Sequence, residues 1–192
     1  SEQFDFSFEH RGSFYACNTD TGLEHKLEDG RIAARAGIHT ETLGPEEIAK
    51  LIPETRVSAV GGVFYPEDGH LQPAQFVTAL AKEAERLGTT IHSDPQMLGS
   101  ASSGGRVQAV RTIRGDFGAD TFVLAAGSWV SQVVRDLGLR LPIQPAKGYS
   151  ITFKRPEKCP SMPVMMTEAK VGATPMADTF RFAGTLELAG LD

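Results

Sequence analysis

The sequence predicts a mixed fold that combines α+β and α/β parts: an antiparallel sheet with helices on one face, interrupted by a helix, a β-meander and a buried parallel strand. Three observations predict it. Strand-like alternation of apolar and polar residues prevails at both ends of the chain, in about residues 1–65 and 143–192. A strongly amphipathic helix lies between them. After it comes the apolar run FVLAA at 122–126, too short for a core helix and typical of a strand buried on both faces.

The first 65 residues contain strand-like and helical stretches in turn. Alternation of phenylalanine with polar residues, broken at Gly12, predicts a β-hairpin. Apolar residues at helical spacing after Asp20 predict a helix that ends at Gly37. The pair Gly61-Gly62, inside a strand-like run, indicates a bulge or a close approach of another backbone. The expected elements are a hairpin at 4–17, a helix at 20–36, a strand at 39–43, a helix at 45–52 and a strand at 57–65.

The rest of the chain carries a long helix, short strands and the apolar run. Pro73 stands near the first helical position, and apolar residues recur at helical spacing up to Leu87. Ser128 is a good N-cap for a later helix that ends at Gly138. The expected elements are a turn at 66–69, a helix at 73–87, two or three short strands between 91 and 113, a strand at 122–126, a helix at 128–137, and strands at 148–154, 164–167, 171–175 and 179–188.

The turn at Gly127 is the first candidate for ligand contact. A strand that ends in a glycine turn at a helix N-terminus points backbone N–H groups at whatever lies above the sheet. This geometry suits an anionic or polar group of a ligand. The same turn also occurs as an ordinary strand-to-helix connection, and the residues alone leave both readings open.

Composition excludes several classes of protein. The 192 residues, 41% hydrophobic and 22% charged, can bury a core of ordinary globular size. A net charge of −5 argues against a nucleic-acid surface, and no apolar run approaches the roughly 18 residues that span a bilayer. Peripheral membrane association stays open. Cys17 and Cys159 form no C-x-x-C pair, which favours a reduced, cytoplasmic compartment. The five histidines have neither metal-ligand spacing nor a nucleophile context, so we expect no metal site and no catalytic triad.

Several segments resemble one enzyme family. VLAAGSWVSQVV, followed by LPIQPAKGYS, resembles the second flavin-contacting segment of FAD-dependent amine oxidoreductases of the D-amino-acid dehydrogenase and oxidase family. GGVFYPEDGHLQPAQFVTALAKEAERLG and FRFAGTLELAGLD agree with it in order and spacing. The similarity runs over most of the chain and is greatest to the bacterial D-amino-acid dehydrogenase small-subunit type. It implies a substrate domain at 1–65 and 143–192, interrupted at 66–142 by part of a Rossmann-like FAD domain.

The resemblance also implies a reaction and a cofactor. It implies oxidation of the C–N bond of a D-amino acid or related amine to an imine and then a 2-oxo acid, with hydride transfer to FAD. An electron carrier or oxygen would then take the electrons, and the residues do not distinguish the two. Two alternatives remain open. One is an FAD-dependent 2-hydroxy acid or glycerol-3-phosphate type dehydrogenase, which more basic residues than the pair Arg135 and Arg140 would favour. The other is a non-enzymatic binding domain on the same sheet.

The family's pyrophosphate cradle has no counterpart here. Members open with a strand, a G-x-G-x-x-G turn and a helix, yet no two of the twenty glycines are spaced as G-x-G. We therefore expect an internal fragment of a larger enzyme, inactive by itself, that binds FAD weakly or not at all. An uncovered sheet edge would favour self-association.

The resemblance assigns cofactor contact to two segments. Gln96 and Met97 fall where the family contacts the adenine side, although the preceding Ser93-Asp94-Pro95 departs from the usual T-x-V pattern. In the glycine turn the backbone, and not the side chains, would bind. The residues of that turn are Ala125, Ala126, Gly127, Ser128 and Trp129.

Substrate contact requires little protein chemistry. Because the flavin takes the hydride, the enzyme anchors the carboxylate, positions the Cα and excludes water, and no side chain is assigned a catalytic role. Arg181 alternates with apolar neighbours and is expected to face solvent. The resemblance assigns the substrate site to Lys147, Tyr149, Lys170, Thr185 and His70.

Overall fold

The computed structural model describes residues 5–93 and 96–190, so Phe4 and the Asp94-Pro95 pair lie outside the described residues. The chain divides into two compact units. The first comprises residues 1–87 and 148–185, and the second comprises residues 88–147 and 186–192. The second unit begins at residue 88, whereas the sequence suggested a start at residue 66. What each unit binds stays a prediction.

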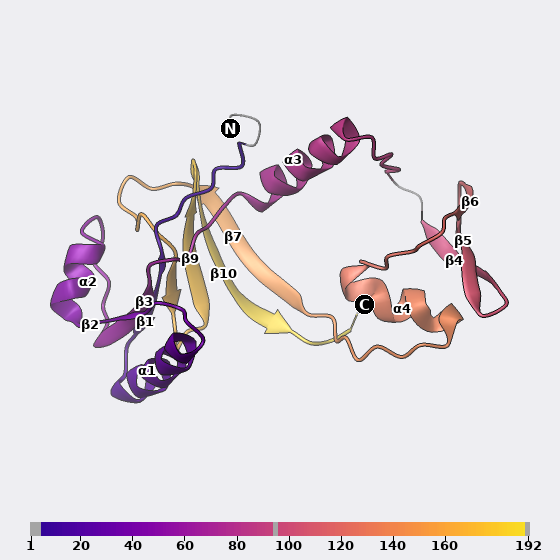
Figure 1. The fold of residues 1–192 in the computed structure, drawn as a ribbon. Helices are drawn as coiled ribbons and strands as arrows, with labels where there is room; N and C mark the ends of the chain where they lie inside the picture. Colours follow the sequence, from indigo (N-terminus) through magenta and orange to yellow (C-terminus); the bar gives the residue numbers. More distant parts are fainter. Residues whose placement is uncertain (1–4, 94–95, 191–192) are drawn as a thin grey trace. The chain divides into compact units, whose positions relative to one another are not determined.

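The first unit contains a seven-stranded mixed sheet (Figure 1). Strand β10 of this sheet ends two residues after the last residue of the unit. The strand order is β2-β3-β1-β8-β9-β10-β7. A large mixed sheet with helices confirms the predicted fold class. One detail differs, because β1 runs parallel to β8 and the sheet is not purely antiparallel. The strands are β1 (Ser13–Cys17), β2 (Glu41–Leu43), β3 (Gly61–Tyr65), β7 (Lys147–Lys154), β8 (Val164–Met166), β9 (Val171–Met176) and β10 (Thr179–Glu187).

The predicted N-terminal hairpin is wrong. β1 pairs with β3 on one side, Phe14 opposite Phe64, and with β8 on the other, Phe14 opposite Val164. Both edges of β1 are therefore occupied by strands distant in sequence. The described residues before Gly12 make one isolated bridge, between Glu9 and His70.

The three predicted helices of this unit are confirmed as α1 (Asp20–Arg35), α2 (Pro45–Leu51) and α3 (Pro73–Arg86). Helices on a single face of the sheet were predicted, and this is wrong. Phe14 and Ala16 of β1 pack with Ile48 and Ile52 on one face. On the other face the Lys26 ammonium of α1 lies 4.6 Å from the centre of the Tyr15 ring. The second face carries the Tyr15 ring and the buried Cys17, so each face of β1 requires a cover.

The close approach predicted at the glycine pair is confirmed at Gly62. This residue lies opposite Ala16 in the ladder, and a Cβ added to it would stand 2.5 Å from Cζ of the Phe14 ring. The ring therefore fills the space that a side chain at Gly62 would need. Phe14 itself is fully buried.

The N-terminus of α1 is held by a carboxylate that follows β8, the strand next to β1 in the sheet. Oε1 of Glu168, in the turn after β8, accepts hydrogen bonds from the backbone N–H of Asn18 (3.0 Å), the backbone N–H of Thr19 (3.1 Å) and the Thr19 hydroxyl (3.0 Å). The Thr19 hydroxyl oxygen also accepts from the N–H of Gly22 at 3.0 Å, as an N-cap does. The hydrogen bond from the Asn18 backbone is the main cause that lowers the pKa of Glu168.

Replacing Glu168 by glutamine should lower the melting temperature of the chain and remove part of its acid sensitivity. The folded-state pKa of Glu168 is depressed, so its stabilising contribution is present above the pKa of the unfolded state and is lost as the pH falls through the folded pKa. Thermal unfolding followed by circular dichroism between pH 7 and pH 3 measures this. Glu54, an exposed carboxylate, provides the matched control through Glu54→Gln. Parallel pH curves for Glu168→Gln and the parent chain would contradict the role.

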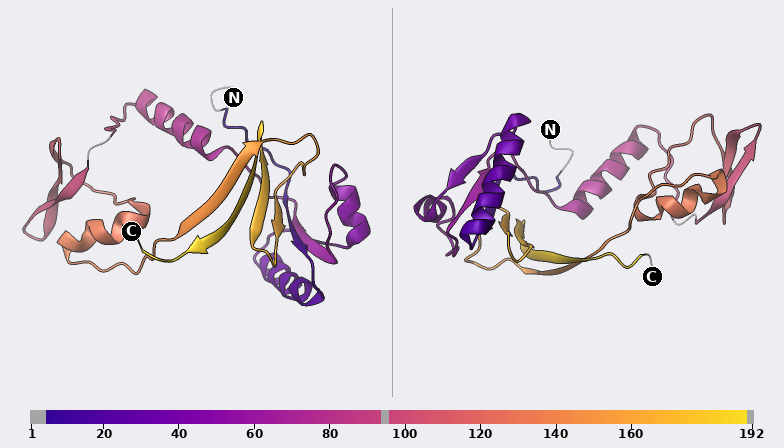
Figure 2. Two further views of the ribbon diagram at one scale, coloured as in Figure 1. Left: turned by 180° about the vertical axis from the view of Figure 1, so that it is seen from behind. Right: turned by 90° about the horizontal axis from the view of Figure 1, so that it is seen from below.

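The second unit contains the predicted meander and a short helical segment. The strands β4 (Met97–Ser103), β5 (Arg106–Thr112) and β6 (Gly115–Gly118) pair in sequence order, which confirms the meander (Figure 2). The helix predicted at 128–137 is confirmed as a composite. Its parts are the 3₁₀ turn η1 (Gly127–Trp129), α4 (Val130–Val133) and the 3₁₀ turn η2 (Val134–Leu137).

Two details of this segment differ from prediction. Residues 122–126 form no strand, and Val123 is 84% exposed. The run is apolar enough for a buried parallel strand, but no strand pairs with it among the described residues. Ser128 is not an N-cap, because helical turns begin at Gly127 and no side chain caps them.

Candidate functional site

The large sheet is open at its β10–β7 end. β7 is the edge strand, and all eight of its residues are exposed, among them the predicted substrate residues Lys147 and Tyr149. Ile151 of the same strand is 71% exposed. Apolar and polar side chains on two accessible faces make this end of the sheet a candidate for ligand contact.

One face of this end carries an aromatic cluster of Phe153, Phe180 and Phe182. Their ring centres lie 5.3–5.9 Å apart. A hollow of about 480 Å³ lies beside them, and the buried Cys159 contributes to its wall. Arg56 also lines this hollow, from an exposed loop. The hollow is mostly apolar, and its cationic groups, Arg56 and Lys158, lie on loops.

The opposite face carries Arg181. In the ladder Arg181 lies opposite Thr174, and alternation along β10 directs it away from the face of Phe180 and Phe182. Its Nη2 donates to the Ser150 hydroxyl at 3.0 Å. Its Nε is buried and makes no hydrogen bond among the described residues. The expectation of a solvent-facing arginine is therefore wrong for the Nε atom.

The structure brings together two predicted substrate residues, Lys170 and Thr185. Gly184 pairs with Val171, and a Cβ added to Gly184 would stand 3.0 Å from the carbonyl oxygen of Lys170. Both residues have left-handed backbones, with φ of 53° at Lys170 and 55° at Thr185. Such angles are uncommon for residues other than glycine and often mark functional sites. Both side chains are exposed, and their contact with substrate stays a prediction.

His70 lies in a packed environment. It is 8% exposed and bridges to Glu9, whose carboxylate lies 3.9 Å from the imidazole Nε2. Burial lowers the pKa of His70, and the Glu9 carboxylate opposes this. Nearby, the Gln72 side-chain amide donates to the carbonyl of Met176 at 3.0 Å. These contacts fix the segment before α3 against the end of β9, and a substrate role for His70 stays a prediction.

The predicted cofactor turn lies in the second unit. Gly127 has φ of 51° and is exposed, and nothing would lie within 4 Å of a Cβ added there. Ala125 is also exposed, and Trp129 is 60% exposed. Small residues and an open backbone fit close approach of a flat ring such as that of a flavin. The short 3₁₀ start at Gly127 provides no helix N-terminus for a phosphate.

Met97, predicted to lie at the adenine side, is in the same unit. It begins β4 opposite Thr112, and the carbonyl of Gln96 accepts a hydrogen bond from the N–H of Ile113 at 3.2 Å. These contacts are those of an ordinary strand entry. The preceding segment Ser93-Asp94-Pro95 departs from the family's T-x-V pattern. Its residues Asp94 and Pro95 lie outside the described residues.

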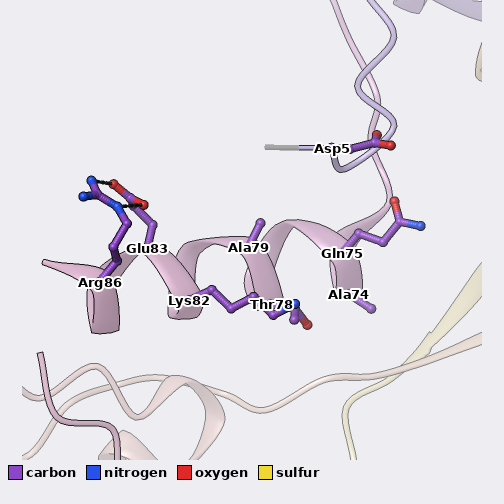
Figure 3. A pocket seen from close by; sticks show the side chains of 8 residues that line it. All are labelled: Asp5, Ala74, Gln75, Thr78, Ala79, Lys82, Glu83 and Arg86. Atoms are coloured by element: carbon purple, nitrogen blue, oxygen red, sulfur yellow. Dashed lines mark hydrogen bonds and ion pairs between the residues drawn. The ribbon is translucent and has the colours of Figure 1, made fainter. Parts of the chain in front are cut away.

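Other surface features of the described residues do not form a site. The hollow beside α3 in Figure 3 follows the exposed side of one helix, and its Arg86 is already paired with Glu83. Among the described residues, no group of three or more His, Cys, Asp or Glu side chains could hold a metal ion. No helix in the described ranges combines the length and apolar character that crossing a bilayer requires.

Residues 1–192 match the family described as DAO, FAD dependent oxidoreductase. The chain belongs to this family. Among curated relatives it is 34% identical over 191 residues to a D-amino acid dehydrogenase of Agrobacterium fabrum and 27% identical over 197 residues to one of Vibrio atlanticus. These matches cover 97% and 100% of the chain, but only 46% and 47% of the relatives. The chain therefore spans about half the length of the curated relatives it matches.

Two solved structures have the same fold as this chain and superpose on its whole length. A glycine oxidase from Geobacillus kaustophilus matches with a TM-score of 0.90 at 19% identity, covering 100% of this chain and 51% of that one. An L-proline dehydrogenase from P. horikoshii matches with a TM-score of 0.87 at 20% identity, covering 100% and 53%. At this identity the likeness shows the fold alone.

Proposed function

We propose that this chain is part of a flavin-dependent oxidoreductase that oxidises the C–N bond of a D-amino acid or related amine. The match of residues 1–192 to the FAD dependent oxidoreductase family, with relatives named D-amino acid dehydrogenase, carries the proposal. When bound, FAD supplies the acceptor for the hydride that leaves the substrate Cα. Water then hydrolyses the imine to a 2-oxo acid and ammonium.

The two units have separate roles in this proposal. The large sheet, with His70 before α3, holds the substrate through Lys147, Tyr149, Lys170, Thr185 or His70. The unit with the meander offers the backbone of the turn at Gly127 to the flavin. The open backbone there supports this role. No G-x-G spacing exists among the twenty glycines, so we expect these 192 residues alone to hold FAD poorly and to be inactive.

The full-length protein should be yellow, and D-amino acids should bleach its flavin absorbance band without oxygen. Anaerobic titration followed by visible absorbance tests this directly. A D-amino acid that bleaches the band while the matching 2-hydroxy acid does not supports C–N oxidation. The reverse result would establish the hydroxy acid alternative, and a colourless, reconstituted protein would leave only the binding-domain alternative. Micromolar FAD binding by the 192 residues alone would contradict the expected lack of a phosphate cradle.

Two further parts of the proposal concern the cellular setting. Cys17 and Cys159 are both buried and unpaired, which supports a reducing, cytoplasmic compartment. The exposed edge strand β7 supports self-association of the isolated chain, because an unpaired strand edge can bind a second copy.

A further inference from the structure

One carboxylate in the second unit joins the two segments predicted to contact the cofactor. Asp136 lies in η2, near the end of the helical segment that starts at Gly127. Its Oδ2 accepts a hydrogen bond from the backbone N–H of Ser100 at 3.3 Å. Ser100 belongs to β4, the strand that begins at Met97. The contact therefore links the turn at Gly127 to the strand entry at Met97.

The backbone of β4 is shaped to receive this carboxylate. β4 is an edge strand of the meander, so the N–H groups on its outer side have no strand to pair with among the described residues. Its ladder with β5 shifts register between Met97 and Gly99, as at a β-bulge. Gly99 has φ of 154°, a conformation that favours glycine, and a Cβ added there would clash with Oδ2 of Asp136. Glycine at this position therefore leaves the space that the carboxylate occupies.

Burial alone does not fix the helical segment at one position along β4. Val134 is 1% exposed and Val130 is 7% exposed, and η2 contacts β4. Apolar burial has no preferred direction, whereas a hydrogen bond to a single N–H selects one position along the strand. In the described part of the chain, the Asp136 contact is the one hydrogen bond recorded between residues 127–138 and the meander. Asp136 therefore determines where the helical segment lies along β4.

The spacing of these two segments matters for a ligand that binds at both of its ends. In FAD the isoalloxazine and the adenine are joined by one chain, so the two ends bind as linked ligands. The second end adds affinity only when its contact segment stands at a separation that the chain can span. A supporting contact outside the binding surface can hold this separation without touching the ligand.

We propose that Asp136 is a positioning residue that sets the spacing between the flavin contact at Gly127 and the adenine-side contact at Met97. The inference rests on the proposed function and deepens it, because it names the group that aligns the two FAD contacts. Asp136 itself does not touch FAD. Its effect therefore appears only for a ligand that reaches both segments, and this distinguishes positioning from a general contribution to stability.

The test measures the binding of FAD, riboflavin and ADP to the full-length apoprotein by titration calorimetry. Riboflavin carries the flavin end alone, and ADP carries the adenine end alone. In Asp136→Ala we expect Kd for FAD to rise about tenfold, the loss of one hydrogen bond to a charged group, while Kd for riboflavin and for ADP changes less than about twofold. Asp136→Asn keeps an oxygen that accepts from Ser100 and should hold Kd for FAD within about threefold of the parent value. Asp116→Ala, which removes an exposed carboxylate of β6, is the matched control and should leave all three values unchanged.

Three results would overturn the inference. An unchanged Kd for FAD in Asp136→Ala would show that the contact does not affect the cofactor. Equal weakening of FAD, riboflavin and ADP would show that Asp136 only supports the fold. The same loss of FAD affinity in Asp136→Asn as in Asp136→Ala would show that the hydrogen bond to Ser100 is not the cause.

A substitution on β4 tests the same contact if Asp136→Ala gives no folded protein. Gly99→Ala places a Cβ against Oδ2 of Asp136, so it should displace the carboxylate and raise Kd for FAD selectively. Gly115→Ala is its control, because Gly115 has φ of 109° and a Cβ there meets nothing within 4 Å. A Gly99→Ala protein that binds FAD as Gly115→Ala does would count against the inference.

Anaerobic bleaching of the parent protein separates this inference from the proposed function. The binding measurements contain no amino acid, so they do not depend on the reaction. If no D-amino acid bleaches the flavin but Asp136→Ala loses FAD affinity selectively, the proposed reaction fails and the positioning role stands. If D-amino acids bleach the flavin and Asp136→Ala binds FAD as tightly as the parent, the proposed function stands and Asp136 does not set the spacing.

Discussion

Replacing Phe14 by alanine should lower the free energy of unfolding of the large-sheet unit by about 3–5 kcal/mol. Phe14 is fully buried in the cluster with Ile48, Ile52 and Val164, and its ring covers the backbone of Gly62. Truncation removes this apolar surface from the core and leaves a cavity. Because Gly62 has no side chain and lies in a ladder, the neighbouring strand cannot fill the space.

Urea unfolding followed by far-ultraviolet circular dichroism measures this change. Circular dichroism is preferred to fluorescence because the single tryptophan, Trp129, lies in the other unit. Phe8→Ala is the matched control, since Phe8 is 57% exposed and its loss should cost less than about 1 kcal/mol. Equal destabilisation by the two substitutions would show that the cluster around Phe14 is not the core of this sheet.

The helices could be predicted because their signals are local. Proline near the first turn, apolar residues at helical spacing and a glycine after the last turn all lie within one segment, and α1, α2 and α3 follow them closely. The meander was predictable for the same reason, since Gly104 and Gly105 connect strands that are neighbours in sequence. Local signals specify elements whose partners are adjacent in the chain.

Strand partners at a distance could not be predicted. The alternating phenylalanines before Gly12 indicated a strand, but β1 already has β3 and β8 on its two edges. The run at 122–126 shows the converse: its apolar character indicates burial, yet Val123 is exposed because no strand lies beside it among the described residues. The hydropathy of a segment predicts that the segment is buried, but not which other segment buries it.

In the candidate site, too, the sequence predicts some features and only the fold shows the others. The sequence selected Lys170 and Thr185 by resemblance, but their left-handed backbones and their adjacency appear only in the fold. For Arg181 the alternation F-R-F predicts the face of the sheet correctly. It cannot predict that Nε is buried, or that Nη2 donates to Ser150, a residue of a strand 31 positions earlier.

Replacing Gly127 by valine should lower the flavin content of the full-length protein about tenfold or more while leaving it folded. Gly127 has φ of 51°, an angle that costs other residues about 1–2 kcal/mol, and a β-branched side chain there would project into the space where we place the flavin. Nothing in the chain lies within 4 Å of the added Cβ, so the substitution creates no clash within the unit itself. Flavin absorbance per polypeptide measures the effect.

Gly138→Val is the matched control for this substitution. Gly138 ends the same helical segment with φ of 69°, and a Cβ there also meets nothing within 4 Å. Both variants therefore carry similar backbone strain, and their melting temperatures should fall by similar amounts. A selective loss of flavin in Gly127→Val then reports ligand contact, because the strain is matched. Equal flavin content in the two variants would show that the turn after residues 122–126 lies away from the cofactor, and the assignment of the second unit to flavin contact would fail with it.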